Sequence, residues 1–126
     1  MTTKQQAWDL FQKGYYDNVD AGNMEAAAAV YHHDLDWSHQ QVWVHHNYQR
    51  TEPSRFTSPQ QILAFLNERK AKLAEAKIRH RVRDMVLDGN KGALLGAVEG
   101  NGPDQPFMVW FELKDGKISR YSLRPL

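Results

Sequence analysis

The chain has no cysteine among its 126 residues. This absence excludes disulfide bonds, thiolate nucleophiles and zinc sites built on sulfur. Long apolar runs are missing too, since the longest covers only residues 26–31, far short of the roughly 20 residues that cross a bilayer. The opening MTTKQQ lacks the apolar core of a signal peptide. We therefore expect no membrane partner and a cytoplasmic location.

The sequence also lacks an excess of charge of either sign. Its 16 lysine and arginine residues nearly balance 15 acidic residues, which leaves a formal net charge of +1. Such a chain produces no field strong enough to gather a polyanion, so we expect no nucleic-acid partner. The length suffices for one hydrophobic core and not for two, which predicts a single domain over residues 1–126.

Two helices are predicted before residue 35. Thr3 and Gln6 form a capping box, and the apolar residues that follow recur at helical spacing, which predicts a helix over residues 4–20. Gly22 is suited to ending this helix and Asn23 to capping a short second one. The apolar stripe of the second helix is Met24, Ala27, Ala28 and Tyr31.

The rest of the chain predicts one more helix and a sheet. Ser58 followed by Pro59 is a strong helix start, and strands are expected over residues 35–39, 78–87, 92–99, 107–113 and 117–124. Residues 42–48 have the pattern of a further strand, and residues 50–57 that of an irregular loop around Pro53. Helices followed by strands joined by short turns predict an α+β domain, with three helices packed on one face of an antiparallel sheet.

Three segments carry a resemblance to a known family: residues 15–23 (YYDNVDAGN), 31–37 (YHHDLDW) and 111–118 (FELKDGKI). With the order of elements, they resemble the SnoaL-like group of the nuclear transport factor 2-like superfamily, which is also called ketosteroid isomerase-like. The resemblance implies a curved sheet wrapped on the helices as an open cone, a cystatin-like roll, and a homodimer. It specifies function weakly, because the superfamily includes isomerases, dehydratases, cyclases and non-enzymes.

The resemblance also implies roles for individual residues. The oxyanion-binding tyrosine of ketosteroid isomerase falls on Tyr15 and its general-base aspartate on His39. Its protonated aspartate falls near Val109, which cannot donate a hydrogen bond, so steroid isomerase activity is not expected. In scytalone dehydratase, a more distant relative, the catalytic histidine and its paired aspartate fall on His80 and Asp20.

Strand alternation places His39 and His80 facing inward without help from any relative. His39 shares a face with Leu35 and Trp37, and His80 shares one with Ile78 and Val82. Each histidine is open to two interpretations: a side chain hydrogen-bonded within the core, or a proton-transferring group in a pocket. The same choice applies to the Tyr15 hydroxyl, and Asp20 is open to a helix-end role instead of a catalytic one.

The aromatic and apolar supply suggests walls for a pocket, although such residues form plain core as often as a ligand cage. The candidates are Trp37, Trp43, Phe65, Met108, Val109 and Trp110. Metal binding is not expected, because the paired histidines His32-His33 and His45-His46 are adjacent and diverge in an extended chain. No cofactor motif is present.

The sequence thus supports two functions. The first is an acid–base enzyme of the isomerase, dehydratase or cyclase kind, working without a cofactor on a small, apolar, carbonyl-containing molecule. In it His39 removes a proton, Tyr15 binds the oxyanion, and His80 acts as an acid or orients a group. The alternative is a non-catalytic ligand-binding or homodimeric assembly protein of the same fold.

Overall fold

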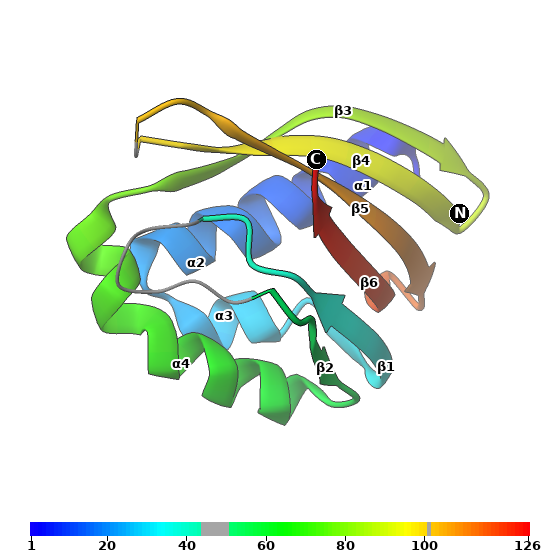
Figure 1. The fold of residues 1–126 in the computed structure, drawn as a ribbon. Coiled ribbons are helices and arrows are strands. Elements are labelled where there is room, and N and C mark those ends of the chain that lie inside the picture. Colours follow the sequence, from blue (N-terminus) through cyan, green and yellow to red (C-terminus); the bar gives the residue numbers. More distant parts are fainter. Residues whose placement is uncertain (44–50, 101) are drawn as a thin grey trace.

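The computed structural model describes residues 1–43, 51–100 and 102–126 (Figure 1). Its first helix is continuous and consists of α1 (Lys4–Asp9), a π-helical part η1 (Leu10–Tyr16) and α2 (Asp17–Ala21). Thr3 and Gln6 form the predicted capping box, and Gly22 ends the helix with a φ of 81°. The predicted bounds of this helix are confirmed, but its π-helical part was not foreseen.

The second helix is shorter than its apolar stripe predicts. Helix α3 (Met24–Ala28) stops before Tyr31, which instead begins strand β1 (Tyr31–His39). Tyr31 pairs with Ile118 of the last strand, so sheet pairing overrides the helical spacing of this residue. The inclusion of Tyr31 in the second helix was therefore wrong, and the first strand is longer than residues 35–39.

The segment predicted as an irregular loop contains a short strand. Strand β2 (Ser54–Phe56) pairs antiparallel with the end of β1, where His39 lies opposite Ser54. Three residues directly after Pro53 give too little alternation to reveal a strand. Helix α4 (Pro59–Ala76) then starts at its predicted cap, Ser58, whose hydroxyl accepts the Gln61 N–H. Of the strand expected over residues 42–48, residues 44–48 lie outside the described part of the chain.

The last four strands follow the prediction closely: β3 (Arg79–Asp88), β4 (Lys91–Glu99), β5 (Gln105–Lys114) and β6 (Lys117–Pro125). The described strands form one sheet in the order β2-β1-β6-β5-β4-β3. All neighbours are antiparallel except β1 and β6, which are parallel. The sheet curves without closing and the helices lie on one side of it (Figure 1), so the predicted α+β cone is confirmed.

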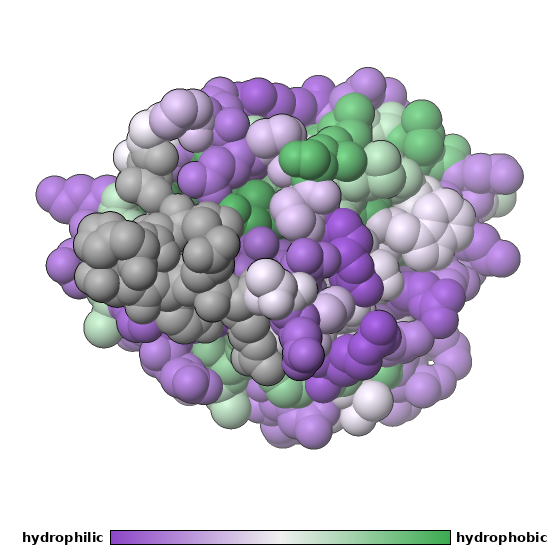
Figure 2. Space-filling view, in the orientation of Figure 1, coloured by the Kyte–Doolittle hydropathy of each residue, from purple (hydrophilic) through white to green (hydrophobic). Residues whose placement is uncertain are grey.

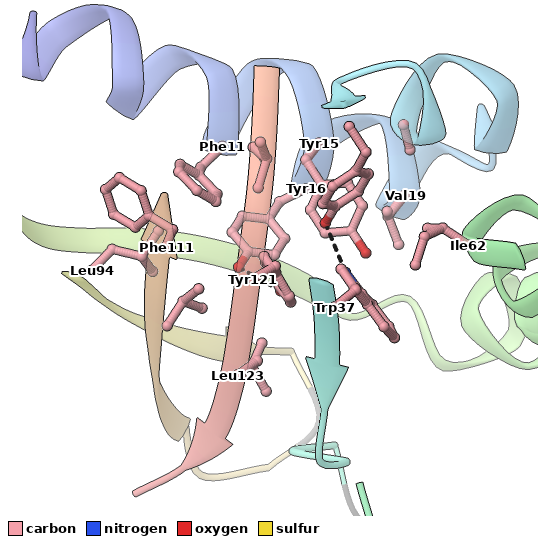
Figure 3. Close-up of a cluster of buried hydrophobic side chains, with 14 of the residues drawn as sticks. Phe11, Tyr15, Tyr16, Val19, Trp37, Ile62, Leu94, Phe111, Tyr121 and Leu123 are labelled. Atoms are coloured by element: carbon pink, nitrogen blue, oxygen red, sulfur yellow. Dashed lines mark hydrogen bonds between the residues drawn. The ribbon is translucent and has the colours of Figure 1, made fainter. Parts of the chain in front are cut away.

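The core fills the space between the first helix and the concave side of the sheet. Figure 3 shows side chains of this helix pointing toward those of the strands in one layer. Trp37 and Tyr121 stack there with ring centroids 5.5 Å apart, and the Trp37 indole donates a hydrogen bond to the Tyr31 hydroxyl. In the described part of the chain, no helix is long and apolar enough to cross a membrane.

Two of the predicted pocket residues lie on the opposite side of the sheet. Met108 and Trp110 are 41% and 45% exposed, whereas Val109 between them is fully buried. Phe107 and Phe111 are buried as well, so odd-numbered residues of β5 face the helices and even-numbered ones face away. Met108 and Trp110 were wrongly assigned to the pocket.

Candidate active site

Two small adjoining cavities lie under helix α4, with volumes of about 50 and 40 Å³. Each has room for about three or four water molecules. They share five lining residues: His39, Arg69, Leu73, His80 and Leu123. The fold thus brings the two inward histidines, from strands β1 and β3, to one small cleft.

Asp20 holds both the ring and the backbone of His80. One carboxylate oxygen lies 2.7 Å from Nδ1 of the ring, and the other accepts the His80 backbone N–H, also at 2.7 Å. Because a carboxylate only accepts, Nδ1 carries the hydrogen, and Nε2 of the neutral ring keeps its lone pair. Both side chains are largely buried, at 16% and 12% exposure, so the ring is fixed in position and tautomer.

Gln12, which the sequence analysis missed, forms hydrogen bonds with the same edge of strand β3 as Asp20. Its amide donates to the His80 carbonyl at 2.9 Å and accepts the Val82 N–H at 2.7 Å. Strand β3 is an edge strand, so this amide takes the place of a missing neighbouring strand. The amide also donates to Asp17 at 2.8 Å. No apolar periodicity marks such a residue, which explains why it was missed.

The Tyr16 ring packs against one face of the His80 ring, and Tyr16 was also missed in the sequence analysis. The two rings stack with centroids 5.4 Å apart and planes within 9°, and the Tyr16 and Tyr121 hydroxyls lie 2.9 Å apart. Tyr15 and Tyr16 are both buried although they are adjacent. Both lie in the π-helical part of the first helix.

Tyr15 lines the larger cavity with a protonated hydroxyl. Burial raises the pKa of Tyr15 to about 12, although hydrogen bonding with Tyr31 and the charge of Arg69 oppose the rise. The phenol therefore keeps its hydrogen at neutral pH and remains a potential hydrogen-bond donor. This is the property that an oxyanion-binding tyrosine requires.

His39 lies among aromatic rings and stays neutral. Its ring stacks on Trp37 with centroids 5.4 Å apart and meets Phe65 edge-on at 5.7 Å. Burial lowers the pKa of His39 to about 3, and the charge of Arg69 acts in the same direction. Such an imidazole is a weak proton acceptor near neutral pH, although it can still form hydrogen bonds.

Arg69 is the third residue that the sequence analysis missed. It stands one helical turn after Phe65 on α4, and its guanidinium carbon lies 4.0 Å from the centre of the Phe65 ring. It lines both cavities. Its position four residues after an apolar residue with an inward face was the available signal, but arginines at such positions commonly reach solvent.

The remaining predicted wall residues divide between cavity and core. Phe65 lines the larger cavity and Trp43 the smaller one. Trp37 is fully buried beneath His39, and Val109 belongs to the core, so the structure places neither among the lining residues. Nowhere in the described ranges do three His, Asp or Glu side chains gather as metal ligands; the pair His45-His46 lies outside those ranges.

A wider recess on the surface shares lining residues with the two cavities. It has a volume of about 410 Å³ and reaches Asp20, Leu73, Ile78 and His80. Leu73 and His80 line this recess and both inner cavities. These two side chains thus lie at the boundary shared by the recess and the inner cavities.

Solved structures share this fold at low sequence identity. A candidate ketosteroid isomerase from Kribbella flavida is 19% identical, with 97% of this chain and 78% of that chain covered and a TM-score of 0.66. A candidate polyketide cyclase from Sinorhizobium meliloti is also 19% identical, with coverages of 87% and 89% and a TM-score of 0.64. A de novo designed protein with a curved β-sheet is 22% identical, with coverages of 99% and 88% and a TM-score of 0.67. At these identities the likeness establishes the fold alone.

Sequence comparison is more specific about the family. No curated protein matches the chain at a significant level. The model of the SnoaL-like domain, however, matches residues 13–121. This span runs from the π-helical part of the first helix into strand β6 and includes His39, Arg69 and His80, so the resemblance seen in the sequence is confirmed. The chain belongs to the SnoaL-like domain family.

Proposed function

We propose that the protein is an acid–base enzyme of the isomerase, dehydratase or cyclase kind, working without a cofactor on a small carbonyl compound. The observation that carries this proposal is the Asp20–His80 pair at the cavity wall. A carboxylate bound to Nδ1 stabilises the imidazolium that forms when Nε2 takes a proton. The family membership agrees with such chemistry but does not decide it.

The sequence-based hypothesis made His39 the base and His80 an acid or orienting group. The low pKa of His39 favours the opposite assignment, with His80 as the base. His80 Nε2 takes a proton from the carbon next to the carbonyl, and the electrons of the C–H bond pass to the carbonyl oxygen. The Tyr15 hydroxyl and neutral His39 then stabilise the enolate by hydrogen bonds. Isomerisation is complete when His80 returns the proton at another carbon. His39 suits the neutral role because its pKa is about 3.

Hydrogen–deuterium exchange tests this proposal even though the natural substrate is unidentified. Small ketones and keto acids are incubated with the protein in deuterated water, and loss of the proton next to the carbonyl is followed by NMR. We expect at least one compound to exchange faster than in buffer, and the His80→Gln variant to slow it by about 10²- to 10⁴-fold. His33→Gln is the control, because His33 is exposed. No exchange above background with any compound would contradict the proposal.

The outer face of the sheet favours the homodimer as a second proposal. Val86, Leu95, Met108 and Trp110 are exposed there, and register places Leu95 beside Met108. Figure 2 shows apolar side chains gathered over the strands. An exposed apolar cluster of this kind marks a protein contact. Native mass spectrometry should show a dimer that Trp110→Glu dissociates; a monomeric wild-type protein would contradict this proposal.

A further inference from the structure

The two cavities are lined by charge of one sign only, as far as the described residues show. Fifteen described residues line them, and among these the only Asp, Glu, Lys or Arg is Arg69. The nearby carboxylate of Asp20 is already bound to the ring and backbone of His80. The other polar groups on the walls are tyrosines, histidines, Gln41 and the Trp43 indole. Among the described lining residues, the cleft therefore has one positive charge beside neutral hydrogen-bond donors.

The guanidinium is held close to the groups proposed for catalysis. It lies 4.0 Å from the Phe65 ring centre, and that ring meets His39 at 5.7 Å. Such stacking on an aromatic face restricts an arginine that would otherwise sample many conformations. The charge is also felt at the two titratable groups: it lowers the pKa of His39, and at Tyr15 it outweighs the opposing effect of Asp20.

We infer that this site binds a small anionic molecule, a carboxylate of a few carbon atoms, with Arg69 as the group that recognises the charge. The inference rests on the proposed function, because it names the chemical class of the molecule that the same cavity would bind. It narrows the expected ligand, since the sequence predicted an apolar carbonyl compound without a charge.

The rest of the cavity fits the apolar part of such a molecule. Leu73, Leu123 and Phe65 provide the apolar wall, and two spaces of about 50 and 40 Å³ limit the ligand to a short chain. Hydrogen bonds from a guanidinium to a carboxylate are roughly twice as strong as those between neutral groups. A neutral molecule of the same shape would form only the weaker, neutral-acceptor hydrogen bond with Arg69.

Binding of acetate, with acetamide as its neutral counterpart of the same shape, tests the inference. Both are titrated into the full chain labelled with ¹⁵N, and the Arg69 Nε–H and the backbone signals of residues 39, 69 and 80 are followed. We expect acetate to shift these signals to saturation and acetamide to bind at least about tenfold more weakly. Equal shifts from both compounds, or no saturable shift from acetate, would overturn the inference.

Two variants of helix α4 separate charge recognition from a general charge effect. Arg69→Gln removes the cavity charge and is expected to weaken acetate binding about tenfold or more, whereas Arg69→Lys should recover part of it. Lys70→Gln makes the same charge change on a residue that lines neither cavity, and it should bind acetate as the wild type does. Wild-type affinity in Arg69→Gln would contradict the inference.

This experiment is independent of turnover. Acetate binding requires no proton transfer, so it is measured in the wild type and the two Arg69 variants whether or not the protein exchanges hydrogen. A protein that binds acetate through Arg69 but exchanges no proton would uphold the anion site and refute the enzyme. The reverse result would refute the anion site alone.

Discussion

Asp20 binds His80 through both of its carboxylate oxygens, one at ring Nδ1 and one at the backbone N–H, each at 2.7 Å. Asp20 lies in the last turn of the first helix and His80 near the start of strand β3, so the contact joins residues 60 positions apart. The two bonds fix where the ring lies and which nitrogen carries the hydrogen. The proposed base therefore depends on a residue from a different element of the fold.

The first prediction concerns the tautomer of His80. In the wild type, ¹⁵N spectra of the neutral ring should show hydrogen on Nδ1, because Asp20 only accepts. In Asp20→Asn the amide can donate to Nδ1 instead, and the hydrogen should move to Nε2. Long-range ¹H–¹⁵N correlations of the ring distinguish the two forms. The same tautomer in both proteins would show that Asp20 does not orient the ring.

The second prediction tests Gln12 as a positioning residue. Gln12→Ala leaves the His80 carbonyl and the Val82 N–H at the sheet edge without their partner. The free energy of unfolding should fall by about 1–3 kcal/mol. The Nδ1–H signal of His80 should also broaden, which a loss of stability elsewhere would not cause.

The control for Gln12 is Gln5→Ala on the same helix. Gln5 is exposed, and within the described residues its amide donates to Asp9 on the helix surface. Its removal should change the free energy of unfolding by no more than about 0.5 kcal/mol. If Gln5→Ala and Gln12→Ala destabilise equally, the amide of Gln12 has no special role.

The third prediction concerns pH and stability. The pKa of His39 is about 3 in the folded protein and about 6.5 when the chain is unfolded. The unfolded chain therefore binds the extra proton first, and stability falls as pH drops from about 6.5 toward 3, by up to about 1.4 kcal/mol per pH unit. Denaturant titrations between pH 7 and 4 measure this slope. His39→Gln should remove this contribution, and an unchanged slope would contradict the burial of a neutral imidazole.

The fourth prediction compares two neighbours on β5. Val109 is fully buried and Trp110 is 45% exposed. Val109→Ala should cost about 1–3 kcal/mol of folding free energy through the cavity it leaves. In dilute solution, where the chain is monomeric, Trp110→Ser should change the free energy of unfolding by about 0.5 kcal/mol or less. A larger effect of Trp110 on the monomer would mean that its side chain supports the core.

Much of the fold was readable from the sequence because local signals agreed with the tertiary structure. The caps at Thr3 and Ser58 set the helix starts, and alternation in β1 placed Leu35, Trp37 and His39 on one face. The same reasoning failed in β5, because residues 107–111 are all apolar (FMVWF). Such a run has no alternation, so nothing local decides which residues face the helices.

Site residues could be predicted from the sequence only where a polar side chain fell at an inward position of a predicted strand. His39 and His80 were found because a polar residue at an inward position is conspicuous. Gln12 and Arg69 were not, because their roles come from β3 being an edge strand and from the approach of α4 to His39, which are properties of the tertiary structure. The parallel pairing of β1 with β6 was hidden for the same reason, since it joins strands that are far apart in the chain.

The most direct test of the proposed mechanism compares two variants in the exchange experiment, on the compound that the wild type exchanges fastest. If His80 is the base and His39 a neutral hydrogen-bonding group, His80→Gln should slow exchange at least about tenfold more than His39→Gln. Both variants must keep the wild-type backbone spectrum away from the cavity. A greater loss in His39→Gln, or wild-type exchange in His80→Gln, would contradict the assignment of His80 as the base.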